Sequence, residues 1–262
     1  MPVEIWEVVF AIAVAASTWL LVKRISLKRK WVAVNFKQET IPDTIGIMLL
    51  LLLICYLIVD KVKQPDALLM YTSLVWFAGW LDDRTGTFYP KGIQGHIKHF
   101  LQTKKWTTGL SKIVLIVLAA AVGLYLGDWR GYGQAVLAFS VMILSPHVCN
   151  ALDTRPLRVW KWTVGHILLF IWMGFPLDDT SSILYGTVVL LTWGYIEKRR
   201  KGMLGDSGAA VIGALLAWSL THHAPLPMQL SLVLAYLAIT IIAEKLSING
   251  LLIKIRNVTA GG

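Results

Sequence analysis

Long apolar blocks make up most of this chain, and short polar stretches separate them. A helix needs about 20 apolar residues to cross the hydrocarbon core of a bilayer, with a range near 17–25. By that measure the pattern predicts an all-α, polytopic membrane helical bundle of about nine transmembrane helices, which forms a single domain over residues 1–262. The predicted spans are approximately 4–22, 44–60, 67–81, 110–127, 132–149, 161–177, 182–196, 203–221 and 227–243.

Composition agrees with a membrane protein. Hydrophobic residues are 56% of the chain and charged residues only 15%, against about 25% charged residues in a typical soluble domain. The first apolar run could be a signal peptide, but its basic residues follow the run and no small-residue cleavage site comes next. Cys55 and Cys149 are expected at different depths, so we expect no disulfide between them.

The basic residues predict the orientation of the bundle. All but three of the 25 Lys and Arg residues lie in one alternating set of loops, and the exceptions are Lys61, Lys63 and Arg130. Because cytoplasmic loops carry the excess of Lys and Arg, the N-terminus is expected outside and the C-terminus in the cytoplasm. The predicted cytoplasmic loops are about 23–43, 82–109, 150–160, 197–204 and 244–262. This topology explains the net charge of +10 better than nucleic-acid binding does, so no nucleic-acid partner is expected.

Two cytoplasmic segments are predicted to be amphipathic helices. Segment 91–105 places apolar residues on one helical face and lysines among its polar positions, and segment 244–258 mixes the same residue types. Both patterns are typical of a basic helix on anionic lipid. In the first segment His96 and His99 could also touch a phosphate, although a surface helix can carry such a pair without a function.

The strongest chemical motif is the Asp82-Asp83 pair at the C-terminal end of predicted span 67–81. A helix C-terminus carries partial negative charge, and adjacent carboxylates repel each other. The pair therefore needs a compensating cation, either a divalent metal or a lysine from the same loop. The alternative is a solvated pair that only ends the span.

Two further motifs lie at predicted cytoplasmic ends of spans. Asn150 and Asp153 are three positions apart and share a helical face, where they offer the oxygen donors that suit Mg²⁺. The alternative is local bonding of these side chains to the backbone at a helix end.

Asp206 lies in the sequence Gly-Asp-Ser-Gly at the start of span 203–221, where an acid is favourable in any case. The flanking glycines are explained by close helix packing.

The three motifs converge on one membrane face. The orientation was derived from Lys and Arg alone, yet it places all five motif residues at the cytoplasmic level. Acids near a membrane bundle are costly and usually functional. Carboxylates for Mg²⁺ combined with cations for phosphate are typical of phosphoryl-transfer sites. The nearby cations are Lys91, Lys98, Arg155, Arg158 and Lys161.

In their order and sidedness, these motifs resemble those of the polyprenyl-phosphate N-acetylhexosamine-1-phosphate transferases. That family includes the phospho-N-acetylmuramoyl-pentapeptide transferase of peptidoglycan synthesis and the N-acetylglucosamine-1-phosphate transferases of teichoic-acid and O-antigen pathways. The resemblance runs from about Asn35 to the tail and is closest to a shorter Gram-positive branch. Members of that branch carry stretches similar to 91–96, 107–109 and 150–158 of this chain.

The resemblance implies roles for individual residues. Asn150 and Asp206 would hold Mg²⁺, with Mn²⁺ as an alternative. Asp82 and Asp83 would handle the pyrophosphate and the attacking phosphate, and Asp153 would position the nucleotide or the metal shell. The residues expected to bind substrate phosphate are Lys98, His96 and Arg155.

The resemblance also implies a reaction. A sugar-1-phosphate, expected to be that of an N-acetylhexosamine, would pass from a UDP-sugar to undecaprenyl or another polyprenyl phosphate with release of UMP. The protein would act in the bacterial plasma membrane to initiate a lipid-linked glycan, and a homodimer is one assembly to consider.

The sequence departs from the family pattern in two places. Better-known branches read Asn-x-x-Asp-Gly-x-Asp-Gly, whereas Thr154, Arg155 and Pro156 follow Asp153 here. The late His-rich loop and the last span of relatives are also absent, which leaves the sugar open.

Other functions fit the sequence less well. A transporter should show charged residues or broken helices at mid-bilayer and often an internal repeat, and the sequence shows neither. A catalytically degenerate relative could act as a membrane scaffold, in which case the three motifs would be free to vary. The CDP-alcohol phosphotransferases are disfavoured, because no single run combines Asp, Gly, Ala-Arg and two further spaced aspartates.

Overall fold

The computed structural model describes residues 5–59, 64–86, 92–129, 131–174 and 180–259, and of residues 247–259 only the backbone. Several residues used in the sequence analysis lie outside these ranges. They are Lys61, Lys63, Lys91 and Arg130.

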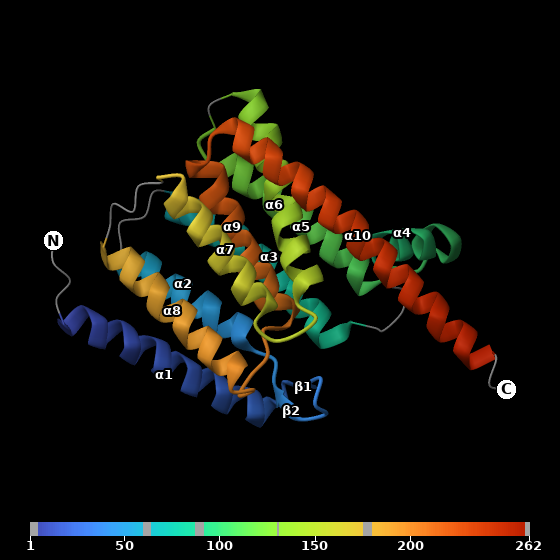
Figure 1. The fold of residues 1–262 in the computed structure, drawn as a ribbon, viewed down its shortest axis with the longest axis horizontal. Helices are drawn as coiled ribbons and strands as arrows, with labels where there is room; N and C mark the ends of the chain where they lie inside the picture. The colour runs from blue at the N-terminus through green and yellow to red at the C-terminus, as the bar shows by residue number, and fades with distance from the viewer. Residues whose placement is uncertain (1–4, 60–63, 87–91, 130, 175–179, 260–262) are drawn as a thin grey trace.

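The described chain is helical apart from one short hairpin, which confirms the predicted helical bundle (Figure 1). The helices are α1 (Ile5–Arg29), α2 (Ile45–Val59), α3 (Pro65–Thr85), α4 (Gly92–Thr103), α5 (Thr108–Leu126), α6 (Tyr132–Leu152), α7 (Arg158–Trp172), α8 (Thr180–Lys198), α9 (Gly205–His223) and α10 (Leu226–Thr259). The hairpin consists of β1 (Val32–Val34) and β2 (Thr40–Pro42).

Every predicted span overlaps one of these helices, and segment 91–105 contains the separate helix α4. Within the described residues, four helical segments are long and apolar enough to cross a bilayer: Ile5–Arg29, Thr108–Leu126, Tyr132–Leu152 and Leu226–Leu246. Helix α2 is apolar but shorter. Several helices thus have the length and apolar character of membrane spans, which supports a membrane protein.

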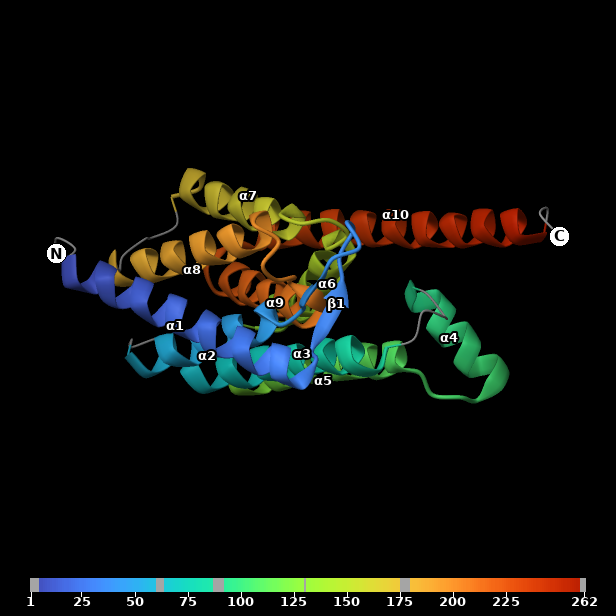
Figure 2. The same cartoon turned by 90° about the horizontal axis from the view of Figure 1, so that it is seen from below.

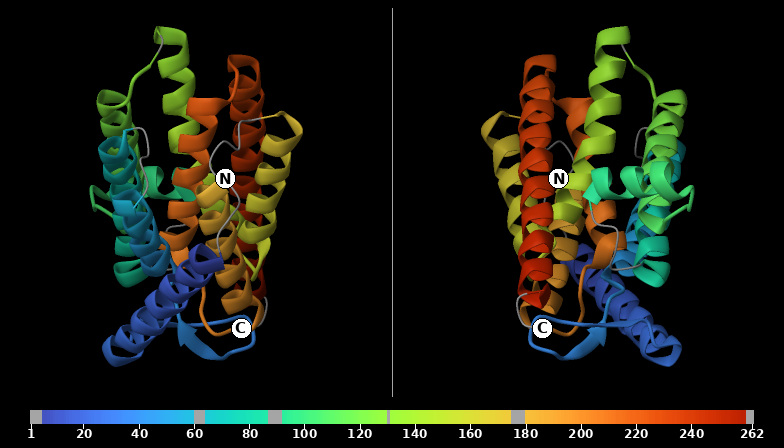
Figure 3. Two further views of the ribbon diagram at one scale, coloured as in Figure 1. Left: turned by 90° about the vertical axis from the view of Figure 1, so that its left-hand side faces the viewer. Right: turned by 90° about the vertical axis from the view of Figure 1, so that its right-hand side faces the viewer.

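Helix α9 is the central element of the bundle, where it packs against α2, α3 and α6 (Figure 3). Small residues allow this close approach. A Cβ added to Gly213 would lie 2.6 Å from the backbone nitrogen of Pro146 in α6, and one added to Gly79 of α3 would lie 2.6 Å from Ser207 Cα. The close helix packing expected at the glycines of span 203–221 is thus present as backbone-to-backbone contact.

The β1–β2 hairpin was not predicted from the sequence. Asn35 closes its turn, because the Asn35 Oδ1 accepts the N–H groups of Lys37 (2.8 Å) and Glu39 (3.0 Å). Next to β2, the Met203 N–H donates to the Pro42 carbonyl at 2.7 Å. The hairpin thus ties the connection between α1 and α2 to the loop that leads into α9.

Helix α4 stands apart from the bundle near α10 (Figure 2), and none of its residues is buried. Its attachment to α10 is polar, because the Ile93 N–H donates to Glu244 Oε1 at 2.5 Å. The tail segment 244–258 continues α10 without a break and does not form a separate helix.

The close contact between α6 and α9 makes Gly213 sensitive to substitution. In Gly213→Ala the new methyl group meets the backbone around Pro146, so we expect a loss of about 1–3 kcal/mol in the free energy of unfolding. Thermal unfolding in detergent measures this loss. Gly165→Ala in α7 is the matched control, because a Cβ there meets nothing within 4 Å. Equal stability of the two variants would contradict the packing described.

Candidate functional site

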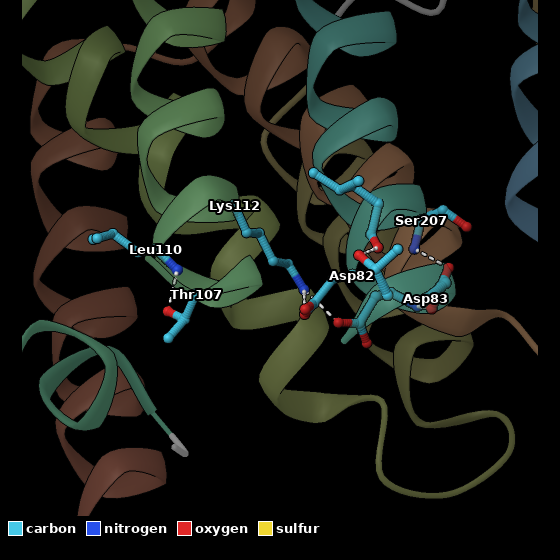
Figure 4. Close-up of polar contacts among 9 residues, drawn as sticks. Asp82, Asp83, Thr107, Leu110, Lys112 and Ser207 are labelled. Carbon is cyan, nitrogen blue, oxygen red and sulfur yellow. Dashed lines mark hydrogen bonds and ion pairs between the residues drawn. The ribbon is translucent and has the colours of Figure 1, made fainter. Parts of the chain in front are cut away.

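The site begins where the end of α3 meets the start of α9. Asp83 Oδ1 accepts the Asp206 N–H (2.8 Å), and Asp83 Oδ2 accepts the Ser207 N–H (3.0 Å; Figure 4). Leu204, at the N-cap position of α9, makes no side-chain cap of its own. Asp83 therefore caps α9 from a different helix, which places a carboxylate at the positive end of the helix dipole.

Lys112, in the first turns of α5, lies between the two other acids of this region. Its Nζ is 2.5 Å from Asp206 Oδ2 and 3.4 Å from Asp82 Oδ2. Figure 4 shows the Lys112 side chain extended from α5 toward Asp82 at the end of α3. The lysine thus supplies the positive charge that the adjacent aspartates require at a helix C-terminus.

Asn150, near the end of α6, completes the group. With the amide oriented by its partners, Asn150 Nδ2 donates to Asp206 Oδ1 (2.9 Å) and Asn150 Oδ1 accepts from Lys112 Nζ (3.1 Å). Residues from four helices therefore meet at one point. The acid cluster is defined here as Asp82, Asp83, Asn150 and Asp206 around Lys112.

The two adjacent aspartates, which lie just beyond predicted span 67–81, differ in acidity. Burial, followed by the negative charge of Asp206, raises the pKa of Asp83 to about 6 despite the backbone N–H groups that it accepts. Burial also acts to raise the pKa of Asp82, but Lys112 and several hydrogen bonds lower this pKa below its ordinary value. Asp82 is therefore the more readily ionised member of the pair.

Asp153 follows α6 and lines a neighbouring pocket of about 80 Å³. Burial, followed by the charge of Glu197, raises the pKa of Asp153 to about 8. Glu197, at the end of α8, holds the same loop, because its Oε2 accepts the Leu157 N–H at 3.1 Å. Arg155 is exposed on the loop and lines the pocket with Arg200.

The two predicted phosphate-binding residues of α4 occupy different environments. His96 is half-buried against the start of α5, where its Nδ1 hydrogen-bonds Thr107 Oγ1 at 2.9 Å. Burial lowers the pKa of His96. Lys98 is exposed, and among the described residues no hydrogen bond or ion pair joins it to the acid cluster.

Two residues of the site were not selected from the sequence. Lys112 was counted only as a cytoplasmic charge, although a lysine from the same loop was expected to compensate Asp82-Asp83. Lys98 is instead the lysine for which the family resemblance implied a phosphate contact. Glu197 was passed over as well. Its signal was a single acid directly before the basic run 198–201.

The donor atoms of the acid cluster can be compared with those that a divalent cation needs. Within the described ranges no group of three or more His, Cys, Asp or Glu side chains is placed to hold a metal. The cluster, however, directs two carboxylates and one amide oxygen toward a single ammonium group. Oxygen donors of this kind are those that Mg²⁺ prefers, so the residues present fit such an ion.

Comparison with known proteins does not assign the chain to a family. No protein-family model matches the chain, and no curated protein matches it either. The interpretation of the site therefore depends on the residues, their contacts and the resemblance of three short motifs.

The cap on α9 gives the first prediction for this site. Asp83→Ala removes two hydrogen bonds to backbone N–H groups and a charge at the helix N-terminus, so we expect a loss of about 0.5–2 kcal/mol in the free energy of unfolding. Thermal unfolding measures the loss. Asp66→Ala, an exposed acid in the first turn of the same helix α3, is the control. An unchanged unfolding midpoint for Asp83→Ala would show that the Asp83 cap does not stabilise the fold.

The raised pKa of Asp153 predicts a pH dependence of stability. Between roughly pH 4 and pH 8 the unfolded chain has released a proton that the folded protein still holds, so the free energy of unfolding falls as pH rises. Asp153→Asn removes this linkage, so between these pH values the free energy of unfolding of the variant should fall less than that of the native protein. Unfolding midpoints near pH 5 and near pH 8 test this, with Arg155→Gln on the same loop as control. Identical slopes for Asp153→Asn and the native protein would refute it.

Proposed function

We propose that this chain is a Mg²⁺-dependent polyprenyl-phosphate sugar-1-phosphate transferase. It transfers a sugar-1-phosphate, that of an N-acetylhexosamine, from a UDP-sugar to undecaprenyl or another polyprenyl phosphate and releases UMP. The observation that carries this proposal is the acid cluster. Three motifs far apart in sequence supply Asp82, Asn150 and Asp206, and all three contact Lys112.

The proposed setting is the bacterial plasma membrane. The chain would cross it nine times, with the N-terminus outside and the C-terminus in the cytoplasm. The support is the agreement of two independent arguments. Loop charges assign all three motifs to the cytoplasmic face, and side-chain contacts join them at one end of the bundle. Both substrates suit this location, because a nucleotide sugar is cytoplasmic and a polyprenyl phosphate presents its head group at the membrane surface.

The proposed reaction forms one bond and breaks another. An oxygen of the lipid phosphate attacks the phosphorus next to the sugar, and the bond from that phosphorus to the bridging oxygen breaks, so UMP leaves with the electron pair. A phosphate monoester has a second pKa near 6 and is mostly ionised at neutral pH. A strong general base is therefore not required.

The residues of the acid cluster have different proposed roles in this reaction. Asp82, Asp206 and Asn150 would hold Mg²⁺, and the ion would neutralise charge on the diphosphate. Both oxygens of Asp83 accept backbone N–H groups, so Asp83 acts by positioning Asp206 at the start of α9. Asp82 is then the member of the pair better placed to orient the attacking phosphate. Lys112 would supply a positive charge beside the diphosphate.

The Asp153 pocket is proposed to take the nucleotide end of the UDP-sugar. With a pKa of about 8, the Asp153 carboxyl is mostly protonated at neutral pH and can donate a hydrogen bond to a carbonyl oxygen. Arg155 and Arg200 line the same pocket and can meet phosphate oxygens. In this proposal, Lys98 and His96 of α4 approach the phosphates of a bound substrate from the other side of the cluster.

Release of UMP tests the proposal directly. Membranes that contain the protein, supplied with undecaprenyl phosphate, Mg²⁺ and a panel of UDP-sugars, should release UMP with one of the sugars. Asp82→Asn and Asp206→Asn should each lower the rate roughly a hundredfold or more, because charge stabilisation dominates such reactions. Asp66→Asn, at the other end of α3, should leave the rate unchanged. Undiminished lipid product in both cluster variants would exclude this function and favour a scaffold or transporter.

A further inference from the structure

Lys112 stands at the position where the donors of the acid cluster converge. Its Nζ lies 2.5 Å from Asp206 Oδ2, 3.1 Å from Asn150 Oδ1 and 3.4 Å from Asp82 Oδ2. The Lys112 side chain is only 12% exposed. The ammonium group therefore holds the oxygens that a divalent cation would need, and no other lysine of the described residues does so.

The same oxygens cannot serve both cations. Mg²⁺ binds oxygen ligands at about 2.0–2.1 Å, and Mn²⁺ prefers the same hard donors. An ion held by Asp82 and Asp206 would thus lie within a few ångströms of the present Lys112 nitrogen. At that separation two cations repel strongly in a partly buried site. Binding of a divalent ion therefore requires Lys112 to leave its position.

We propose that Lys112 is an internal counterion that occupies the divalent-metal position of the acid cluster, and that metal binding displaces its ammonium group toward the phosphate oxygens of the substrate. This inference rests on the metal site of the proposed function. It adds that Lys112 and the divalent ion compete for the same oxygens of the acid cluster. Lysine suits the role, because its ammonium is a point charge on a flexible four-carbon stem.

The surroundings of Lys112 support such an exchange. The backbone of α5 is held at its first turn, since Thr107 Oγ1 accepts the Leu110 N–H at 3.3 Å. The side chain can therefore move without the helix. In its present position Lys112 offsets the repulsion between Asp82 and Asp206, so the cluster stays assembled without metal. The expected consequence is a preformed site of weakened metal affinity.

Mn²⁺ binding to the purified full-length protein in detergent tests the competition. Lys112→Met keeps much of the stem and removes the charge, so we expect its Mn²⁺ dissociation constant to fall at least tenfold, measured by electron paramagnetic resonance of the free ion. Mn²⁺ should also raise the unfolding midpoint of Lys112→Met more than that of the native protein. Lys105→Met, an exposed lysine before the same helix, is the charge-matched control and should bind Mn²⁺ as the native protein does.

A second measurement uses the native protein and does not depend on the folding of a variant. Acylation of lysines by an N-hydroxysuccinimide ester, read by mass spectrometry, should increase at Lys112 when Mn²⁺ is added and stay constant at Lys105. Equal or weaker Mn²⁺ binding by Lys112→Met overturns the proposal, and so does labelling of Lys112 that Mn²⁺ leaves unchanged.

These outcomes are separable from those of the UMP assay. If the native protein releases no UMP and Lys112→Met binds Mn²⁺ more tightly, the exchange is supported and the transferase is rejected. Normal UMP release by the native protein, together with unchanged Mn²⁺ affinity in Lys112→Met, would reject the exchange and leave the transferase in place.

Discussion

The close approach of the α9 N-terminus to the end of α3 is the constraint on which the remaining site geometry depends. Gly79 brings the two backbones together, and Asp83 then satisfies the first free N–H groups of α9. A helix end buried without such a partner would leave donors unsatisfied at a cost of several kcal/mol. The contact determines where Asp206 lies, and through Asp206 the positions that Lys112 and Asn150 can take.

This arrangement gives the adjacent aspartates different roles. Asp83 is engaged by backbone N–H groups, whereas Asp82 faces the ammonium of Lys112. Adjacent residues at a helix end point in different directions, so one can hold the fold together while its neighbour remains available to a ligand. Loss of activity on substitution at Asp83 is therefore expected to have a structural component that substitution at Asp82 lacks.

A network of this kind depends on mutual compensation. Removal of Lys112 leaves Asp82 and Asp206 partly buried without their shared cation, which is more costly than the worth of a single ion pair. Asp153 on the adjoining loop and Glu197 at the end of α8 form a second acidic pair, and burial keeps a proton on Asp153 at neutral pH. The two groups give one end of the bundle a charged centre beside a pocket that changes charge above neutral pH.

The sequence by itself determined the helical class, the approximate position of each helix and the three polar motifs, because long apolar blocks and the requirement to satisfy backbone groups in lipid leave few alternatives. It also predicted that Asp82-Asp83 needs a cation. Only the tertiary structure decided which cation that is. Lys112 is 30 positions from Asp82 and lies beyond the separate helix α4, so no local spacing connects them. The link from the β1–β2 hairpin to the loop before α9, the cap that Asp83 forms and the contact of Glu197 with the Asp153 loop have the same origin. Each joins segments distant in the chain, and packing of whole helices, not the pattern of neighbouring residues, brings such segments together.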